Sequence, residues 1–294
     1  MLSTPDIFSR YEEIRFRLPQ AQRFNVTRDI DDLNDIAEQA KAFVFDAFGV
    51  LNVGETLIKG ADQRLRELRA LGCKIRILTN ASSYDRFRAI EKFSKLGIEI
   101  EDDEIITSRD AALLVLTSGF WGVIAAKEDN LSDLEVDYVR LSDHAQDYDL
   151  AESFLFLSSS GWTEVRQQLL KQSLLKNDRS VIIANSDIVA PRDDGFSLEP
   201  GHFGHNLADC GIKNVRFFGK PFPEVYDLVE ASLSGIPVHQ IAMCGDTLHT
   251  DILGAAARGW QTVLVTQDGL FSGHDTKKYS SQSKIYPDWR VTRI

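Results

Sequence analysis

The sequence predicts an α/β protein whose strands form parallel sheets. Short apolar runs such as AFVFD (42–46) and QIAMCG (240–245) suit strands that are buried on both faces. Amphipathic helical patterns separate such runs, for example ADQRLRELRALG (61–72) and DRFRAIEKFSKLG (85–97). Because strands that alternate with helices form βαβ units, the pattern favours a parallel sheet with helices on both faces.

The first part of the chain contains the elements that begin this alternation. Residues 1–40 are predicted to form one or two helices with acidic turns, and the apolar run at 42–46 follows them directly. A helix that ends near Gly72 then leads to a second apolar strand, KIRILT (74–79). One strand–helix–strand unit is therefore complete before residue 85.

The rest of the chain repeats the alternation. Further strands are expected at 121–126, 154–159, 180–185, 215–219, 240–245 and 261–266, and further helices at 163–175, 224–235 and 248–259. The Gly-, Pro- and Asp-rich segment 186–201 is predicted to be a turn region, and the polar tail from about residue 272 is expected to be irregular and poorly ordered. These elements form two α/β units, and periodicity alone leaves open whether one is inserted in the other.

Composition and charge argue against several classes of protein. The formal net charge of -11 argues against broad nucleic-acid binding, because a phosphate backbone requires clustered Lys and Arg. No apolar run is long enough to span a bilayer, and the charged N-terminus lacks the apolar core of a signal peptide. Cys73, Cys210 and Cys244 lie far apart among apolar neighbours, as reduced thiols do. We therefore expect a cytoplasmic protein that binds neither nucleic acid nor a membrane.

Polar residues gather where four of the predicted strands end. The segments are 45–51 (FDAFGVL), 78–80 (LTN), 219–223 (GKPFP) and 245–251 (GDTLHTD). In an open α/β sheet, ligands bind outside the carboxyl ends of the strands. If these strands are neighbours, their carboxylates, hydroxyl, amide and lysine converge on one site.

Local sequence leaves two interpretations open for the acidic residues of these segments. Asp46 ends an apolar strand, where a carboxylate can act as a nucleophile or simply cap the following turn. Asp246 and Asp251 offer hard oxygen ligands suited to Mg2+, and they would equally suit a helix N-terminus.

The remaining residues of the four segments are similarly ambiguous. Lys220 lies in a rigid Gly-Lys-Pro turn and could neutralise charge at a reacting group, although most lysines are simply solvated. Thr79 and Asn80 could bind an anion or form an ordinary capped turn.

Taken in order, the four segments resemble the haloacid dehalogenase superfamily. The patterns are DxxGVL, TN, GKPxPxxY and GDxxxTDxxGA, and the resemblance runs from about residue 42 to residue 270. More specifically, it is to the type IIA branch, which includes sugar-phosphate, nitrophenyl-phosphate and pyridoxal-phosphate phosphatases. The resemblance implies a Rossmann-like core at 41–108 and 211–294, with an α/β cap domain inserted at 109–210. Residues 1–40 have no counterpart in the motif core and are predicted to be a helical extension that could mediate homo-oligomer formation.

The resemblance also implies roles for particular residues. Asp46 would be the nucleophile and Lys220 would stabilise charge, and Thr79 and Asn80 would contact phosphoryl oxygens. Asp46, Asp246, less directly Asp251, and the backbone carbonyl of Phe48 would hold Mg2+. Asn185 and Asp187 resemble the cap loop that selects substrates, although alone they suit a strand-ending turn. The implied substrate is a small phosphorylated metabolite, hydrolysed through an aspartyl-phosphate.

Phe48 departs from the pattern of the phosphatases. At this position they carry a second aspartate, which protonates the leaving group, and phenylalanine cannot transfer a proton. General acid–base catalysis typically contributes ~10²–10⁴-fold, so a standard mechanism should be severely slowed. Two alternatives follow: a dehalogenase or phosphonatase type of attack on carbon, and a non-catalytic protein that binds a phosphorylated ligand. His249, His202 and His205 are further candidate acid–base residues.

Overall fold

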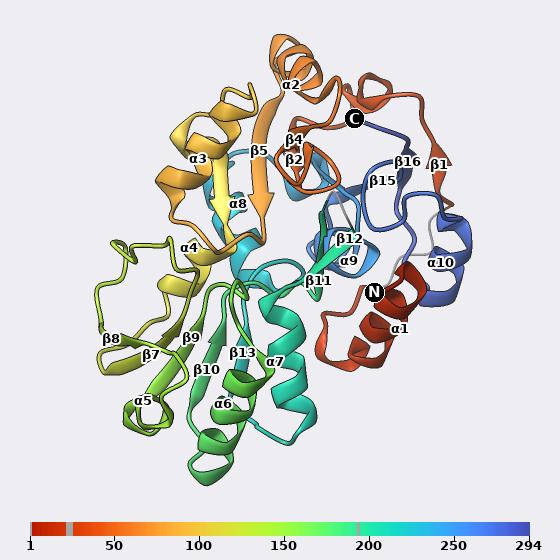
Figure 1. Cartoon of the computed structure of the whole chain (residues 1–294). Helices are drawn as coiled ribbons and strands as arrows, with labels where there is room; N and C mark the ends of the chain where they lie inside the picture. Colours follow the sequence, from red (N-terminus) through yellow and green to blue (C-terminus); the bar gives the residue numbers. More distant parts are fainter. Residues whose placement is uncertain (1, 22–25, 193–194) are drawn as a thin grey trace.

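The computed structural model describes residues 2–21, 26–192 and 195–294, and this part of the chain contains a seven-stranded and a five-stranded sheet (Figure 1). The seven strands lie in the order β1-β16-β15-β14-β2-β5-β6, and the five in the order β13-β10-β9-β7-β8. Neighbouring strands pair in parallel throughout both sheets, and helices cover them, which confirms the predicted α/β class.

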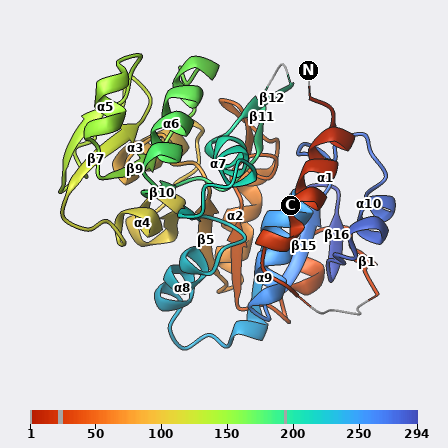
Figure 2. The ribbon, with the colours of Figure 1, turned by 90° about the horizontal axis from the view of Figure 1, so that it is seen from below.

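The strands of the larger sheet come from both ends of the chain. They are β1 (Arg28–Asp29), β2 (Ala42–Phe45), β5 (Lys74–Thr79), β6 (Ile105–Thr107), β14 (Ile241–Gly245), β15 (Gln261–Val265) and β16 (Trp289–Val291). The smaller sheet consists of β7 (Phe120–Ile124), β8 (Asp137–Arg140), β9 (Ser153–Phe156), β10 (Ser180–Ile183) and β13 (Val215–Phe217). We refer to the segment from β7 to β13 as the five-stranded unit and to the rest as the seven-stranded unit (Figure 2).

Helices connect most of these strands. The α-helices are α1 (Thr4–Glu13), α2 (Ala61–Ala70), α3 (Arg86–Lys95), α4 (Ser108–Leu113), α5 (Ala145–Leu150), α6 (Glu164–Lys176), α7 (Pro200–Asp209), α8 (Pro223–Ser232), α9 (Leu253–Ala257) and α10 (Thr276–Ser283). Short 3-10 turns lie at η1 (Arg15–Arg17), η2 (Leu33–Ile36), η3 (Asp102–Glu104) and η4 (Val238–Gln240), and η5 (Leu248–Ile252) is a π-helix.

Side chains that alternate along the buried strands pack against helices on both faces of the larger sheet. In β2, Phe43 and Phe45 pack with residues of α2 and α3, whereas Ala42 and Val44 pack with residues of α8. Successive side chains of a strand point to opposite faces, so a wholly apolar strand requires cover on both sides. This explains why the run AFVFD forms a central strand of a doubly wound sheet.

The five-stranded unit has one face of its own and one shared face. Phe154 and Phe156 of β9 contribute to a cluster with residues of α6 and α7. Leu155, on the opposite face of β9, belongs to the same cluster as Val44 of β2. The two units therefore share a hydrophobic cluster, which holds the carboxyl ends of the larger sheet beside the smaller one.

Three sequence-based expectations were wrong, and two of the errors concern pairing between strands that are far apart in the chain. The predicted turn region 186–201 contains a β-hairpin of β11 (Val189–Arg192) and β12 (Gly195–Leu198) and then the start of α7. The tail beyond residue 272 forms α10 and β16, and β16 pairs with β15 inside the larger sheet. Residues 1–40 are not only helical, because β1 pairs with β16 at the edge of that sheet.

The boundary placed after residue 210 also differs from the arrangement of the strands, because β13 (Val215–Phe217) pairs with β10 in the smaller sheet. A further hairpin, β3 (Asn52–Val53) with β4 (Thr56–Leu57), follows the first motif. Within the described residues, no helix combines the length and the apolar character needed to cross a membrane.

Candidate active site

The four motif segments meet at the carboxyl edge of the larger sheet. Asp46 directly follows β2, Thr79 ends β5, and Asp246 directly follows β14. These three strands are neighbours in the order β14-β2-β5. Lys220 arrives from the other side, because it follows β13 of the five-stranded unit and precedes α8. The expected convergence is therefore observed, and it depends on contributions from both sheets.

Three carboxylates and one ammonium form the centre of the site. The Lys220 Nζ atom lies 2.5 Å from an oxygen of Asp46 and 2.7 Å from an oxygen of Asp251. One oxygen each from Asp46, Asp246 and Asp251 lies within 4.8 Å of the other two. Lys220, Asp246 and Asp251 are buried, and Asp46 is 14% exposed, so it is the member of the pair with Lys220 that solvent or a ligand can reach.

Main-chain donors and close packing hold the acidic side chains in place. The Leu270 N–H donates to Asp246 at 2.6 Å and the Thr247 N–H donates to Asp251 at 3.0 Å. Gly49 has a φ of +79°, and a Cβ there would lie 2.7 Å from an Asp246 oxygen. A side chain at position 49 would therefore be strained and would collide with the carboxylate.

Burial and mutual repulsion perturb the carboxylates. Burial raises the pKa of Asp246 to about 8, and the charges of Asp251 and Asp46 add to this effect. Burial also raises the pKa of Asp46 to about 6, although the Lys220 ammonium opposes the shift. For Lys220, burial alone would lower the pKa, but Asp251 and Asp46 together raise it above its ordinary value, so the lysine remains protonated.

This donor set fits a divalent cation. The cluster contains three carboxylates and one ammonium group, so among the described residues its negative charge is not fully balanced. Carboxylate oxygens are the kind of ligand that Mg2+ prefers. A bound cation would relieve the repulsion that raises the pKa of Asp246.

Thr79 and Asn80 lie at the end of β5, but their side chains are used differently. The Thr79 hydroxyl accepts a hydrogen bond from the Ala81 N–H at 3.1 Å, so its own hydrogen can point to an anion. The Asn80 amide donates to Asp187 at 2.8 Å and to the Lys220 carbonyl at 3.0 Å, and it accepts from the Lys220 N–H at 2.7 Å. Asn80 therefore ties the motif loops together, and a phosphate contact from Asn80 would have to come from its main chain.

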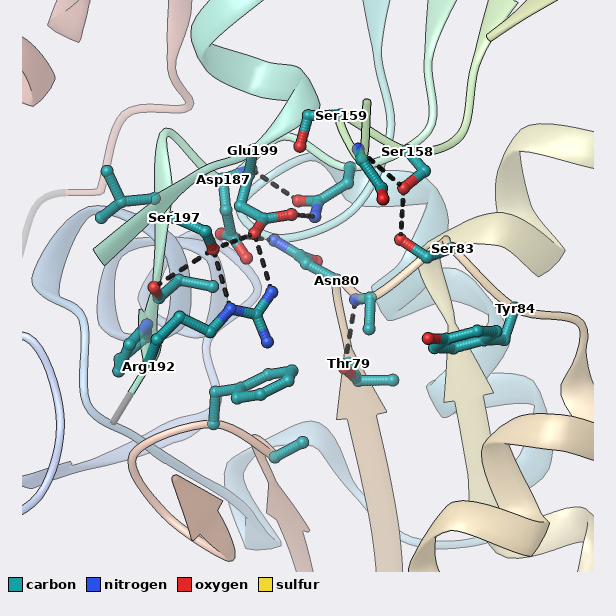
Figure 3. A pocket seen from close by; sticks show the side chains of 18 of the residues that line it. Thr79, Asn80, Ser83, Tyr84, Ser158, Ser159, Asp187, Arg192, Ser197 and Glu199 are labelled. Atoms are coloured by element: carbon teal, nitrogen blue, oxygen red, sulfur yellow. Dashed lines mark hydrogen bonds and ion pairs between the residues drawn. The ribbon is translucent and has the colours of Figure 1, made fainter. Parts of the chain in front are cut away.

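The loop after β10 carries Asn185 and Asp187 into the same cavity. Asn185 accepts from the Asp187 N–H at 2.8 Å and donates to Glu199 at 3.2 Å, while burial raises the pKa of Asp187 well above its ordinary value. Figure 3 shows Asp187 close to Asn80, with Glu199 beside Arg192. The loop therefore connects the motif residues to the hairpin β11–β12.

A cavity of about 630 Å³ opens above these residues. Its lining includes Asp46, Phe48 and Lys92 from the seven-stranded unit and Arg192 from the five-stranded unit. The Phe48 ring is only partly buried, with the Lys92 Nζ atom 4.4 Å and the Arg192 guanidinium carbon 4.9 Å from its centroid. The cavity is large enough for a small organic ligand.

Local sequence features did not indicate the role of α1 near this site. The Tyr11 hydroxyl accepts from the Ile188 N–H at 3.3 Å, next to Asp187, and the Tyr11 ring stacks on His249 at 4.9 Å. The His249 Nε2 atom lies 2.5 Å from a Glu12 oxygen, and burial lowers the pKa of His249. The helix therefore bridges the two units, and in both ribbon views it lies beside α10 (Figures 1 and 2).

The three candidate histidines lie away from the described lining of the cavity. His249 is fully buried against α1, which differs from the solvated or capping position that is usual in a first helical turn. His205 stacks on Phe217 at 4.1 Å, and His202 lies near the Asn206 amide at 3.0 Å. Both lie on α7, three residues apart, and therefore on the same side of the helix.

Together, the fold and the site define a hydrolase of the α/β class, and two family models identify it more closely. A model for haloacid dehalogenase-like hydrolases matches residues 43–129, and a HAD-hydrolase-like model matches residues 217–290. The chain belongs to the haloacid dehalogenase-like hydrolases, and the predicted family and enzyme class are confirmed. The segment between the two matches includes most of the five-stranded unit.

Relatives of the chain include several phosphatases. The chain is 27% identical to the chloroplastic phosphoglycolate phosphatase 1A of Arabidopsis thaliana over 92% of this chain and 80% of that protein. Among solved structures, it resembles a possible sugar phosphatase from Cytophaga hutchinsonii, with a TM-score of 0.77, 23% identity and coverage of 90% and 98% of the two chains. It also resembles p-nitrophenyl phosphatase from Archaeoglobus fulgidus, with a TM-score of 0.70, 22% identity and coverage of 87% and 97%. These two likenesses concern the fold.

Proposed function

We propose that this hydrolase is a Mg2+-dependent phosphatase that cleaves a small phosphorylated metabolite through an aspartyl-phosphate on Asp46. The observation that carries the proposal is the buried cluster in which Lys220 bridges Asp46 and Asp251 beside Asp246. The phosphatases among the relatives support the same chemistry. A cytoplasmic location and a homo-oligomeric state remain predictions from the sequence.

Each residue of the cluster would have a distinct part in the reaction. An Asp46 oxygen would attack phosphorus, and the bond between phosphorus and the leaving oxygen would break. Lys220, held between Asp46 and Asp251, would offset charge that develops on the phosphoryl group. The free hydrogen of the Thr79 hydroxyl would orient a phosphoryl oxygen.

The proposed Mg2+ would be held by Asp46, Asp246, the backbone carbonyl of Phe48 and, less directly, Asp251. When bound, Mg2+ supplies positive charge to the phosphoryl oxygens. The chain itself would keep these ligands in place through the hydrogen bonds that Asp246 and Asp251 accept from main-chain donors.

Departure of the leaving group is the step that Phe48 makes difficult. Without a carboxylic acid at this position, the reaction loses roughly 3–5 kcal/mol of barrier lowering, the equivalent of ~10²–10⁴ in rate. The proton would come from the substrate, from water or from another side chain, and good leaving groups would need it least. We therefore expect activated esters to be the better artificial substrates.

The five-stranded unit would act as a cap that excludes water and reads the leaving group. Asn185 and Asp187 line the cavity near Asp46, and Asp187 contacts the motif residue Asn80 directly. A substrate that enters this cavity would meet the motif residues on one side and the loop after β10 on the other.

The test is hydrolysis of a panel of phosphate esters, including 4-nitrophenyl phosphate, with Mg2+ and with a chelator. We expect turnover that requires the metal and that Asp46→Asn abolishes, whereas the surface substitution Asp62→Asn leaves it unchanged. Acid quenching during turnover should trap one phosphoryl group on the protein. Absence of turnover for every ester in the panel would contradict the proposal, and ligand-dependent thermal stabilisation without turnover would indicate a binding protein instead.

A second candidate function rests on Phe48. Attack of Asp46 on carbon, or cleavage of a phosphonate, requires no leaving-group acid, and an aromatic residue is compatible with either reaction. Release of halide or cleavage of a P–C bond that continues in EDTA would favour this alternative. The retained acids Asp246 and Asp251 favour the phosphatase, because their charge has little use in a metal-free attack on carbon.

A further inference from the structure

We infer that the leaving group of the substrate carries its own anionic group, a carboxylate or a second phosphate, which binds between Lys92 and Arg192 above the Phe48 ring. This inference rests on the proposed phosphatase function and specifies its substrate class. Lys92 and Arg192, which lie outside the four motif segments, would then determine which leaving group the protein accepts.

The two cations approach the same aromatic ring from different units. Lys92 lies in α3 of the seven-stranded unit, and Arg192 ends β11 in the five-stranded unit. The Lys92 Nζ atom and the Arg192 guanidinium carbon lie 4.4 and 4.9 Å from the centroid of the same ring. Phe48 is two residues beyond Asp46, and all four side chains line one cavity. A leaving group attached to a phosphate at Asp46 would therefore extend toward these cations.

Arg192 is held in position while part of it remains available. Its Nε atom donates to Ser197 at 2.9 Å and its Nη2 atom lies 3.1 Å from a Glu199 oxygen. Glu199 is fixed in turn, because it also accepts from Ser197 at 2.6 Å and from Asn185 at 3.2 Å. The Nη1 atom makes no hydrogen bond with the described residues, and the side chain is 36% exposed at the cavity. Figure 3 shows the guanidinium between Ser197, Glu199 and the open space.

Lys92 has a weaker partner than Arg192. Its ammonium lies 3.2 Å from Glu55, whose side chain is 79% exposed, whereas Lys92 itself is only 20% exposed. An ion pair with such an exposed carboxylate contributes little, so a substrate anion can replace Glu55 or join it. Glu128, another acid of the lining, is also exposed.

The aromatic ring explains why two cations can lie so close to an apolar side chain. The face of a phenyl ring attracts cations. The Phe48 ring therefore stabilises Lys92 and Arg192 and shields their charges from part of the solvent. There they would attract an anion more strongly than cations in open water do. With Phe48 in place of the aspartate expected at this position, the site lacks an acid but has an aromatic ring and two cations beside which a negative group can bind.

The experiment uses matched aryl phosphates that share a similar leaving oxygen. The anionic ester is 4-carboxyphenyl phosphate, the neutral comparison is 4-carbamoylphenyl phosphate, and an aryl bisphosphate tests the second source of charge. We expect kcat/KM of the full-length protein for at least one anionic ester to exceed that for the neutral ester by roughly 10-fold or more, because hydrogen bonds to charged groups are the stronger ones.

Variants then assign the preference to the two cations. Arg192→Gln and Lys92→Gln should each lower kcat/KM for the preferred anionic ester by roughly 10- to 100-fold, mainly through KM, and change the neutral ester by less than about 3-fold. Lys95→Gln, one turn further along α3 and exposed, is the matched control and should change neither. Arg192→Lys should restore part of the preference.

A binding measurement keeps the inference testable when catalysis is slow. The product analogue 4-hydroxybenzoate should inhibit competitively with inorganic phosphate present, and 4-hydroxybenzamide should inhibit more weakly. Equal kcat/KM values for anionic and neutral esters, or equal losses for both in Arg192→Gln, would overturn the inference and leave the phosphatase proposal intact. Failure to hydrolyse any ester would instead remove the proposed function, and equal affinity for the two phenols would then remove this inference as well.

Discussion

Replacement of Phe48 by aspartate is the most informative single perturbation of this protein. The substitution installs a carboxyl group two residues after Asp46, on the wall of the same cavity. Phe48 is only partly buried, so no large void results, and the two cation–ring contacts that disappear are replaced by contacts of Lys92 and Arg192 with a carboxylate. We expect Phe48→Asp to fold and to hydrolyse alkyl phosphates faster than the unchanged protein.

The size of the gain follows from the charges around position 48. A well-placed general acid contributes ~10²–10⁴-fold. Here the new carboxyl would lie near the ammonium of Lys92 and the guanidinium of Arg192. Opposite charges within about 4–6 Å lower the pKa of an acid by about 1–3, which keeps it ionised and reduces its ability to donate a proton. We therefore expect a gain near 10²-fold, larger at pH 5 than at pH 8.

The assay is kcat for an alkyl phosphate and for 4-nitrophenyl phosphate between pH 5 and pH 8. The gain should be larger for the alkyl ester, whose leaving group needs the proton more. Phe48→Asn is the matched control, because asparagine has the shape of aspartate but no acidic proton. If Phe48→Asn accelerates the reaction as much as Phe48→Asp does, or if neither does, the reasoning that position 48 lacks a proton donor is wrong.

Four further predictions concern the metal, Lys220, α1 and the buried histidine. Mg2+ at 100 times its Kd should stabilise the protein by about 2.7 kcal/mol, and Asp246→Asn should remove most of this gain in a thermal melt; an equal gain in the variant would contradict the metal assignment. Lys220→Met leaves the partly exposed Asp46 and the buried Asp251 without their counter-charge and should cost about 3–5 kcal/mol of unfolding free energy, measured against the exposed control Lys213→Met. Tyr11→Phe removes the acceptor of the Ile188 N–H and should cost about 1–3 kcal/mol and raise KM more than it lowers kcat; unchanged KM would show that α1 does not position the loop. Burial, aided by Arg17 and Arg10, lowers the pKa of His205 to about 3, so the unfolded chain binds more protons below about pH 6.5 and stability falls as pH decreases from there. His205→Phe should flatten this acid limb in denaturation curves recorded between pH 4 and pH 7, and an unchanged slope would refute the assignment.

Much of the larger sheet was predictable because its strands are buried on both faces. The runs at 42–46, 74–79 and 240–245 correspond closely to β2, β5 and β14. A strand that is covered on both sides is mostly apolar, so a short window of sequence is sufficient to recognise it. The same locality made Asp46, Thr79 and Asp246 visible as polar residues at strand ends.

Two of the elements that were missed, β1 and β16, depend on partners far away in the chain. The local sequence of residues 286–291 does not indicate a strand. β16 forms there because it pairs with β15 on one side and with β1 on the other. The hairpin β11–β12 has the composition of a turn, and its role appears only where Arg192 meets Phe48. Contacts of this kind are properties of the folded arrangement.

By itself, the sequence determined the class of fold, the buried central strands and the motif residues, since each depends on chemistry within a few neighbouring positions. Tertiary structure decided what surrounds them: that the Asn80 amide ties loops together, that Tyr11 reaches the loop after β10, and that Lys92 and Arg192 share one ring. The physical reason is that charge and burial act through space, and distances between residues far apart in the chain exist only after the chain has folded.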